Sequence, residues 1–467
     1  MTERVLYIPF DHLNSSYGVL ATANKKTDLI VLVESRRMIS SPKWHKERLF
    51  FLISSARHFA KELQNQGFQV QYIKAENTVI GLRDVAKDKP VYSAEPSSFT
   101  QTEQLADFGV SFVPNDFFLT PREVFLDWAK QQKTYVMENF YRKQRQRLGI
   151  LVNNGEPEGG QWNFDKDNRL GPPKNYEFPG PLEFERDDID LEVAKELGMV
   201  ATNTWATTRT GALAALNHFI ENSLSGFGPY EDASTNSSWT LHHSLLSPYL
   251  NNGLLHASEV VEAAVSKYRF GGVPIQSLEA FVRQVIGWRE YINGMYWFLG
   301  KSYREHNKLG AKRDLLPLYT DSSKTKMNCV SSVVSDVEKR AWTHHIPRLM
   351  ILSNLALITG NNPQQFLDWM RENFIDAAEW VMVPNVIGMA THADGGILMT
   401  KPYAAGGAYI SRMTEYCGSC IYDPKKRVGD DACPFTTLYW DFLDRHKEIF
   451  SKNHRMSQQV NGLKRLS

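Results

Sequence analysis

The chain has 467 residues, of which 42% are hydrophobic and 22% are charged, and its formal net charge is +1. This length is too great for one compact core and predicts two or three domains, while the composition is that of a soluble globular protein. A net charge so close to zero excludes nucleic-acid binding through overall charge, so any such contact must come from a local basic face. No stretch approaches about twenty uninterrupted apolar residues, which excludes a membrane span. The N-terminal segment MTERVLYIPFDHLN indicates a first strand rather than a signal peptide, so we expect a cytoplasmic protein.

The first third of the chain alternates between strand and helix signals. Apolar runs of strand length occur at residues 4–10, 28–34, 68–75 and 110–113. Residues 44–66 carry apolar side chains at helical spacing, and Gly67 follows as a natural C-cap. Residues 120–123 (TPRE) have the pattern of a capping box with proline at the first helical position, so another helix is predicted there. Strands alternating with helices predict a parallel sheet in an α/β domain over residues 1–130.

The remainder of the chain divides into a linker and a helical domain. Residues 131–209 are predicted to be an interdomain linker, because most of this segment is rich in Gly, Pro, Asn and charged residues. After it the strand signals stop, and Asn362-Pro363 supplies the cap and first residue of a helix. Residues 210–467 are therefore predicted to be an all-α domain, with helical periodicity at residues 212–220, 258–268, 278–297, 340–359 and 363–380.

All four cysteines lie in the last third of the chain, and their spacing predicts a metal site rather than disulfides. Cys417 and Cys420 form a C-x-x-C pair, Cys433 follows with a proline behind it, and Cys329 lies far upstream. A C-x-x-C turn can direct two thiolates at one metal, while folding must deliver the other two ligands. The spacing alone allows both structural zinc and an iron–sulfur cluster.

Several segments of the chain resemble the photolyase and cryptochrome family. The flavin-binding blocks of that family are similar in order to HSLLSPYLNNGLL (243–255), IGWREY (286–291), HHIPRLM (344–350) and FIDAAEWVMVPNVIGM (374–389). Its iron–sulfur bacterial cryptochromes and photolyases are similar to GGQWNFDKDNR (159–169), ADGG (393–396), KPYAAGGAYISRM (401–413), YCGSC and ACPFTTLYW (432–440). The resemblance spans nearly the whole chain. It implies an N-terminal α/β domain, a C-terminal helical domain that holds FAD, and a [4Fe-4S] cluster rather than zinc at the four cysteines.

The resemblance also implies roles for individual residues. Positions that match FAD contacts are Ser244, Leu246, Ser247, Gln284, Arg289, Arg348, Asp376, Glu379 and Asn385. The two serines precede a predicted helix start, where phosphates are favoured. Asn385 matches the residue near the flavin N5, where an amide suits both neutral and reduced flavin. Tyr403 and Tyr409 match the pocket that receives a lesion flipped out of the duplex.

The activity that the resemblance implies is repair of ultraviolet-damaged DNA by light-driven electron transfer from reduced FAD. Repair of a pyrimidine (6-4) photoproduct also transfers a hydroxyl group, for which a proton-donating histidine is the natural catalyst. The pair His344-His345 resembles this determinant, which photolyases for cyclobutane dimers typically lack, so (6-4) repair is the expected function. Adjacent helical residues point about 100° apart, so at most one of the two histidines is expected to face a given reacting atom.

The chain departs from the group along the route that delivers electrons to photo-oxidised flavin. Asp321 occupies a position that usually holds tryptophan, Trp369 is followed by Met370 rather than tyrosine, and Trp342 replaces a tyrosine. Trp342 and Trp369 are therefore candidate members of an altered route. Repair from flavin that is already reduced need not depend on this route, but photoreduction is expected to be slower or rerouted.

The N-terminal domain is expected to hold an antenna chromophore. The group resembles binders of 6,7-dimethyl-8-ribityllumazine. Glu34 ends a predicted strand, which is where open α/β sheets bind ligands. Asp11 and His12, which end the first predicted strand, are further candidates, although acids at strand ends often cap helices.

Two other functions are compatible with the sequence. A blue-light sensor would share the flavin and the cluster but lack lesion turnover, and the altered electron route favours it as the alternative. A zinc-stabilised DNA-binding module without photochemistry would be colourless. Under the expected function the partner is ultraviolet-damaged DNA, and the protein is a monomer that makes no membrane contact.

Overall fold

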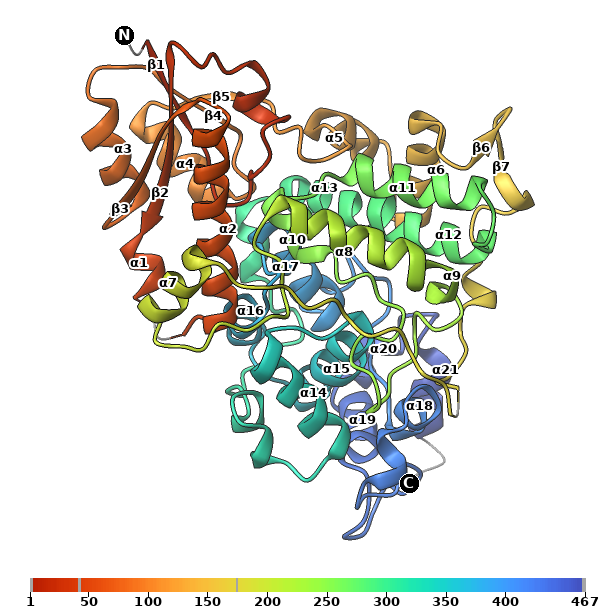
Figure 1. Ribbon diagram of the computed structural model, residues 1–467. Helices are drawn as coiled ribbons and strands as arrows, with labels where there is room; N and C mark the ends of the chain where they lie inside the picture. Colours follow the sequence, from red (N-terminus) through yellow and green to blue (C-terminus); the bar gives the residue numbers. More distant parts are fainter. Residues whose placement is uncertain (1–2, 41–42, 174, 464–467) are drawn as a thin grey trace.

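The N-terminal part of the protein is built on a five-stranded parallel sheet (Figure 1). The computed structural model describes residues 3–40, 43–173 and 175–463. The strands lie in the order β3-β2-β1-β4-β5, so the chain crosses from one half of the sheet to the other between β3 and β4. Their bounds are β1 Arg4–Tyr7, β2 Asp28–Ser35, β3 Gln69–Ala75, β4 Val91–Ala94 and β5 Ser111–Val113. The predicted parallel sheet is confirmed.

Helices cover both faces of this sheet, because successive side chains of a strand point to opposite sides. The helices are α1 Arg36–Ile39, α2 Lys46–Asn65, α3 Thr78–Ala86 and α4 Phe99–Phe108. Leu32 of β2 lies in the core that includes α2, and the adjacent Val33 lies in the core that includes α3. Strand β4 and helices α3 and α4 are additional to the predicted elements.

The next two helices follow the sheet in sequence but pack on the helical half. They are α5 (Arg122–Lys130) and α6 (Met137–Leu148), and α5 contacts α13 (Glu290–Leu299). A Cβ atom on Gly294 would lie 2.1 Å from the ring of Phe125, so glycine is required for this close approach. The capping box predicted at Thr120 does not form among the described residues: its N–H donates to Glu290 at 2.7 Å and its hydroxyl to Gln144 at 3.2 Å.

The predicted linker contains more regular structure than its composition indicates. After α6 it forms a short antiparallel hairpin, β6 Val152–Asn153 with β7 Glu156–Pro157, and later the helix α7 Asp188–Glu196. Figure 1 shows this yellow segment running across the helical half to α7, which packs on α2, before it returns to the helical half. The linker therefore ties the two halves together.

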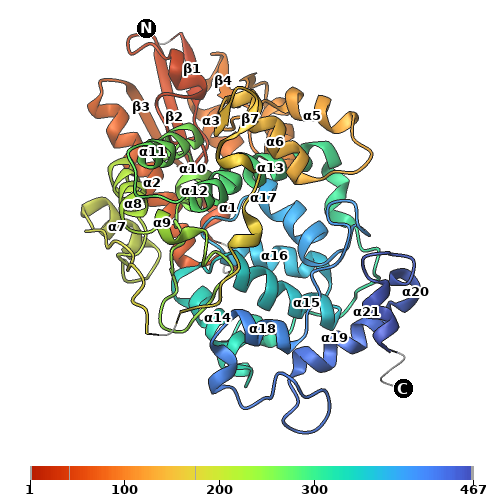
Figure 2. The same cartoon turned by 90° about the vertical axis from the view of Figure 1, so that its right-hand side faces the viewer.

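The rest of the chain is predominantly helical, as predicted, and lies below the sheet in Figure 2. Its α-helices are α8 Arg209–Asn222, α9 Leu224–Phe227, α10 Ser247–Asn252, α11 Ala257–Arg269, α12 Ile275–Val282, α13 Glu290–Leu299, α14 Asn328–Arg340, α15 Asn354–Thr359, α16 Pro363–Asn373, α17 Glu379–Pro384, α18 Gly407–Met413, α19 Pro434–Arg445, α20 Lys447–Phe450 and α21 Ser457–Gly462. Within the described ranges, no helix combines the length and apolar character needed to cross a membrane.

Two of the predicted helices are interrupted. The helix predicted over residues 340–359 is not continuous at its start. Ala341 adopts a left-handed conformation with φ 54° and ends α14. The helix predicted over residues 363–380 breaks after Asn373 and resumes at Glu379. The predicted cap at Asn362 is confirmed, since its side chain accepts hydrogen bonds from the first turn of α16.

Candidate functional site

The helical half encloses a large cavity of about 850 Å³. We call this the large cavity. Its volume lies in the upper part of the range of about 300–1,000 Å³ that is typical of ligand and cofactor sites. Ten residues predicted to bind cofactor or lesion, or to act as the acid, line it: Ser244, Ser247, Gln284, Arg289, His345, Arg348, Asp376, Asn385, Tyr403 and Tyr409. The fold thus gathers residues that are up to 165 positions apart.

Three π-helical segments contribute to the wall of the large cavity. They are Arg283–Arg289, Pro347–Ser353 and Asn385–Ala390. A π-helical turn widens the helix and redirects the side chains that follow, and such turns occur frequently at functional sites. Four of the predicted cofactor residues lie in these segments: Gln284, Arg289, Arg348 and Asn385.

A hydrogen-bonded ion pair fixes one side of the large cavity. Two nitrogens of Arg348 donate to the two carboxylate oxygens of Asp376, each at 3.0 Å. The hydroxyl of Ser247 donates to the same carboxylate at 2.7 Å. Such a bidentate, largely buried arrangement is stronger and more directional than a surface ion pair. It holds the guanidinium of Arg348 in place before any ligand binds.

Arg289 provides a second positive charge deep in the wall. It donates to Glu290 at 2.8 Å, and its guanidinium lies 4.2 Å from the ring centre of Phe118 and 5.4 Å from that of Trp380. Burial lowers the pKa of Arg289 from its ordinary value. Its Nε atom has no hydrogen-bond partner in the described part of the chain. This buried donor suits a ligand rich in acceptor atoms.

Two amide side chains present acceptor atoms to the same space. The amide nitrogen of Gln284 donates to the carbonyl of Ala280 at 3.2 Å, and that of Asn385 donates to the carbonyl of Val381 at 2.8 Å. Each bond ties the nitrogen to the preceding helical turn, which leaves the amide oxygen available to a ligand.

Two of the predicted cofactor residues are not among the described residues that line the large cavity. Leu246 is buried immediately before α10. Glu379 accepts a hydrogen bond from the hydroxyl of Tyr296 at 2.8 Å and faces Arg371 at 3.7 Å. Its carboxylate is thus engaged with protein groups, whereas that of Asp376, three residues earlier, faces the cavity.

The two predicted histidines occupy different environments. His345 lines the large cavity, its side chain is 52% exposed, and its Nε2 lies 3.5 Å from a carboxylate oxygen of Asp232. His344 is 3% exposed, and its ring stacks on that of His243 with centres 4.1 Å apart. Burial lowers the pKa of both His344 and His243 well below the ordinary value. The sequence does not indicate that His243 and Asp232 lie beside His344 and His345, because only the fold brings these residues together.

The lining of the large cavity carries both signs of charge. Besides Arg289, Arg348 and Asp376, the lining includes the basic residues Arg169, Arg283, Lys401 and Arg412 and the acidic residues Asp165, Glu231 and Asp232. Burial raises the pKa of Glu231 to about 8. The positive side chains can contact phosphates, and one of the acidic ones, Asp232, lies beside His345.

All four cysteines line one second, much smaller cavity, which we call the cysteine cavity. Burial raises the pKa of Cys417 to about 11 and that of Cys329 well above the ordinary value, so thiolates here require a cation nearby. A Cβ atom on Gly407 would lie 2.9 Å from the sulfur of Cys433, so glycine makes room for this side chain. Within the described residues, no three cysteine sulfurs lie within 4.8 Å of one another.

The candidate electron-transfer tryptophans are both buried. Trp342 packs on Trp205 and Trp239, with ring centres 6.1 and 5.6 Å away, and the guanidinium of Arg348 lies 5.9 Å from its ring centre. Trp369 packs instead on Tyr319, with ring centres 5.1 Å apart. The side chain of Asp321 is 44% exposed.

The candidate antenna residues lie at two strand ends of the sheet. Glu34 is the penultimate residue of β2, is 2% exposed, and accepts hydrogen bonds from Arg57 and from the hydroxyl of Tyr72 at 2.6 Å. Asp11 and His12 follow β1, which adjoins β4 at the point where the strand order reverses. The ring of His12 is buried and stacks on that of Phe117, with centres 4.4 Å apart.

The sequence of this chain is similar to a protein family and to known relatives. The family described as "Deoxyribodipyrimidine photo-lyase-related protein" matches residues 6–210. The chain is 40% identical to the (6-4) photolyase of Agrobacterium fabrum, over 100% of this chain and 96% of that protein. It is 31% identical to an uncharacterized protein of Acanthamoeba polyphaga mimivirus, over 22% of this chain and 75% of that protein.

The fold is also similar to a known crystal structure, that of a bacterial class III photolyase from Agrobacterium tumefaciens. The TM-score is 0.60 with 16% identity, over 96% of this chain and 98% of that chain. This likeness concerns the fold, whereas the 40% identity over the whole length concerns the sequence itself. The protein therefore belongs to the photolyase family, which implies a flavin cofactor and a DNA substrate.

Proposed function

We propose that this protein repairs pyrimidine (6-4) photoproducts in DNA by light-driven electron transfer from reduced FAD. The observation that carries the proposal is the half-exposed imidazole of His345 in the wall of the large cavity. A proton donor at this place is what hydroxyl transfer requires and what simple splitting of a cyclobutane dimer does not. The name of the Agrobacterium fabrum relative supports the same substrate.

The residues of the large cavity fit FAD. Arg348, held by Asp376, and the buried Arg289 offer donors to a ligand that carries phosphates and ring carbonyls. Gln284 and Asn385 offer amide groups, which can bond to a flavin ring edge without adding charge. When bound and reduced, FAD supplies the electron that light transfers to the lesion.

His345 and its neighbours are proposed to act on the lesion. The carboxylate of Asp232, 3.5 Å from Nε2, orients the ring of His345 at the edge of the cavity. Tyr403 and Tyr409 line the same space and offer aromatic faces to a flipped base. The cationic side chains of Arg169, Lys401 and Arg412, which line the same cavity, are suited to the phosphates on either side of that base.

A [4Fe-4S] cluster is proposed for the cysteine cavity. In a tetrahedral zinc site with bonds of about 2.3 Å the sulfurs lie about 3.8 Å apart. Here no three of the described cysteine sulfurs lie within 4.8 Å of one another, which favours a larger group. Cysteine thiolates are also the usual ligands of iron–sulfur clusters. The cavity's surroundings, which include Met327, Ile410 and Phe435, would keep water from such a cluster.

The antenna chromophore is proposed to be 6,7-dimethyl-8-ribityllumazine, bound by the sheet domain. Open α/β sheets bind ligands at the carboxyl ends of the strands where the strand order reverses. Asp11 and His12 follow β1 at that point, and Glu34 is the penultimate residue of the neighbouring β2. The carboxylate of Glu34 is already bonded to Arg57 and Tyr72, so an antenna would share it with those groups.

A blue-light sensor without repair activity is the second candidate. The observation in its favour is the row formed by Trp342, which is buried, and Trp239, which is half-buried. This row could carry electrons between solvent and the cavity wall at Arg348. In either function we propose a monomer that acts in the cytoplasm.

The deciding experiment compares two lesions in defined oligonucleotides. Purified protein with reduced flavin is illuminated with DNA that carries either a (6-4) photoproduct or a cyclobutane dimer, and the restored bases are quantified by chromatography. We expect restoration of the (6-4) substrate and no measurable action on the dimer. A protein that absorbs blue light and leaves both lesions intact would be a sensor, and a colourless protein would contradict both functions.

A further inference from the structure

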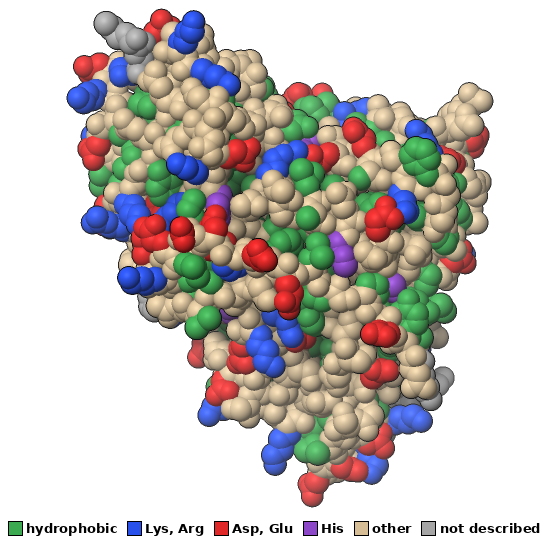
Figure 3. Space-filling view, viewed as in Figure 1, with side chains coloured by type: hydrophobic (Ala, Val, Ile, Leu, Met, Phe, Trp, Pro, Cys, Tyr) green, Lys and Arg blue, Asp and Glu red, His purple; other side chains and the backbone are tan. Residues whose placement is uncertain are grey.

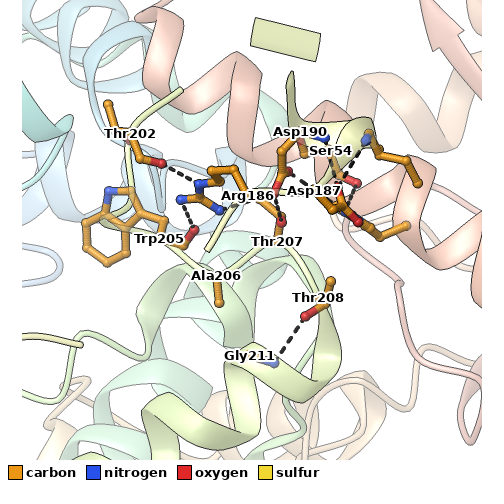
Figure 4. A network of polar contacts seen from close by, with 12 residues as sticks. Ser54, Arg186, Asp187, Asp190, Thr202, Trp205, Ala206, Thr207, Thr208 and Gly211 are labelled. Atoms are coloured by element: carbon orange, nitrogen blue, oxygen red, sulfur yellow. Dashed lines mark hydrogen bonds and ion pairs between the residues drawn. The ribbon is translucent and has the colours of Figure 1, made fainter. Parts of the chain in front are cut away.

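A polar cluster lies where the linker helix α7 meets α2, in a region outside both cavities (Figure 4). It consists of His58 from α2 and of Asp187 and Asp190 from the start of α7, and it is called the junction cluster below. One ligand atom from each of the three lies within 4.8 Å of the other two. Figure 4 shows Asp187 and Asp190 beside Ser54, which precedes His58 by one helical turn.

The ring of His58 faces a hydrogen-bond acceptor at each of its nitrogens. Nδ1 lies 2.9 Å from the carbonyl oxygen of Ser54, and Nε2 lies 2.9 Å from Oδ2 of Asp187. A carbonyl can only accept, so Nδ1 must carry the proton of that bond. In the neutral ring, Nε2 then directs a lone pair at a carboxylate. Two acceptors so close together require a positive species between them, either a proton or a metal ion.

Asp190 distinguishes the two possibilities. Its Oδ2 accepts from the hydroxyl of Thr207 at 3.2 Å and faces Arg186 at 3.4 Å. Its Oδ1 has no hydrogen-bond partner within the described ranges, although the residue is only 2% exposed. A buried carboxylate oxygen without a partner is unfavourable. A proton on Nε2 of His58 satisfies Asp187 but gives Oδ1 of Asp190 no hydrogen bond, because that oxygen lies 4.0 Å from the other ring nitrogen, Nδ1. A cation within the cluster satisfies both carboxylates.

We propose that the junction cluster binds a divalent transition-metal ion, with Zn²⁺ as the best match. One imidazole and two carboxylates are donors that Zn²⁺ accepts, at about 2.0–2.2 Å. A metal-ligating histidine commonly donates its other N–H to a backbone carbonyl, as Nδ1 of His58 does to Ser54. The buried hydroxyl of Ser54 has no partner among the described residues and is available to a water in the fourth position.

A metal ion at this place fastens the linker to the sheet domain. The neighbouring Arg57 already joins the same elements, because it pairs with Glu196 of α7 at 2.6 Å and with Glu34 of β2 at 3.0 Å. Figure 3 shows acidic side chains gathered over α7, with basic side chains beside them. The side chain of Asp187 is 58% exposed, so an ion can reach the cluster from solvent. The role of the site is therefore to stabilise the junction between the two halves.

The test measures zinc and iron in the full-length protein with its iron in place. After loosely bound metal is removed, the protein is exposed to about 100 µM Zn²⁺ and passed through a desalting column. We expect one zinc per chain, with a higher Tm in its presence because the ion binds the folded state. His58→Gln and Asp187→Asn should each weaken zinc binding by at least about tenfold and remove the Tm shift, with unchanged iron. Asparagine is as good an N-cap as aspartate, so Asp187→Asn preserves the start of α7.

Two controls make the outcome specific. His218→Gln changes another histidine at the linker, one whose Nε2 lies 2.9 Å from the carbonyl of Gly180, and it should bind zinc like the wild type. Cys417→Ser should bind as much zinc as the wild type, which would show that the ion at the junction does not use the cysteines. Absence of bound zinc in the wild type, or equal zinc binding by the wild type and both cluster variants, would overturn the proposal.

Discussion

The two cavities of the helical half differ in whether their buried ionisable groups have charged partners within the protein. In the large cavity, the buried charges are paired within the protein, as Arg348 is with Asp376 and Arg289 with Glu290. In the cysteine cavity, burial raises the pKa of Cys329 and Cys417, and among the described lining residues there is no cationic side chain to compensate a thiolate. The large cavity is thus preformed, whereas thiolates in the cysteine cavity would need a cation that its described lining does not supply.

If the two cavities differ in this way, the largest effect is expected from a substitution in the cysteine cavity. Cys417→Ser should remove iron and lower solubility, because the energy of metal binding is also folding energy for the surrounding segment. The measurement is iron per chain together with the soluble fraction after expression. Ser419→Ala, which lies in the same C-x-x-C turn, is the matched control and should keep its iron. Full iron content in Cys417→Ser would show that this cysteine is not a ligand.

The next largest effect is expected at the histidines of the large cavity. His345→Ala should lower repair by about 10²–10⁴-fold, because it removes a proton donor that acts only after the electron arrives. FAD content should be unchanged and lesion affinity should stay within about tenfold, or about 1.4 kcal/mol. His344→Ala should have the smaller effect on repair, since its ring is buried against His243. Equal repair rates for His345→Ala and the wild type would exclude the proposed acid.

A smaller effect is expected at the ion pair that preforms the large cavity. Asp376→Asn leaves Arg348 without its carboxylate partner and should weaken FAD binding by about tenfold, which corresponds to about 1.4 kcal/mol. Glu379→Gln is the matched control, because its carboxylate faces Tyr296 and Arg371 rather than the cavity. Fluorescence titration of released FAD measures both. If Glu379→Gln weakens FAD binding more than Asp376→Asn, the assignment of the cavity wall is wrong.

The smallest effect concerns the supply of electrons to the large cavity. Trp342→Phe should slow photoreduction of oxidised FAD by a few-fold, and Asp321→Trp should accelerate it, while repair from chemically reduced flavin stays the same in both. Absorbance changes under blue light report the rate. An unchanged rate in Trp342→Phe would indicate that electrons take another route, such as one through Trp369, which packs on Tyr319.

The fold could be predicted where its signals are local. Strand β2 is a continuous apolar run because both its faces are covered, and the Asn-Pro start of α16 is a local cap. Strand β4 is only four residues long and contains Tyr92 and Ser93, so its pairing with β1 and not its composition defines it. The break between α16 and α17 depends likewise on tertiary packing, and it is what separates Asp376 from Glu379.

The candidate site could be predicted as a list of residues but not as a geometry. The cysteines stand out because the residue type is rare, and the cofactor residues because their order resembles that of a known family. The π-helical turns, the choice of His345 over His344, and the pairing of His345 with Asp232 arise from contacts between distant segments. The junction of His58 with Asp187 spans 129 positions and has no local signal either.

Light is proposed to drive repair of the (6-4) lesion from reduced flavin in the large cavity. The most direct measurement is the fraction of (6-4) lesions restored per flash of blue light, with the flavin fully reduced, fully oxidised, or reduced and kept in the dark. The account predicts restoration only in the illuminated, reduced sample. Restoration that is equal in the dark, or no restoration in any of the three samples, would contradict it.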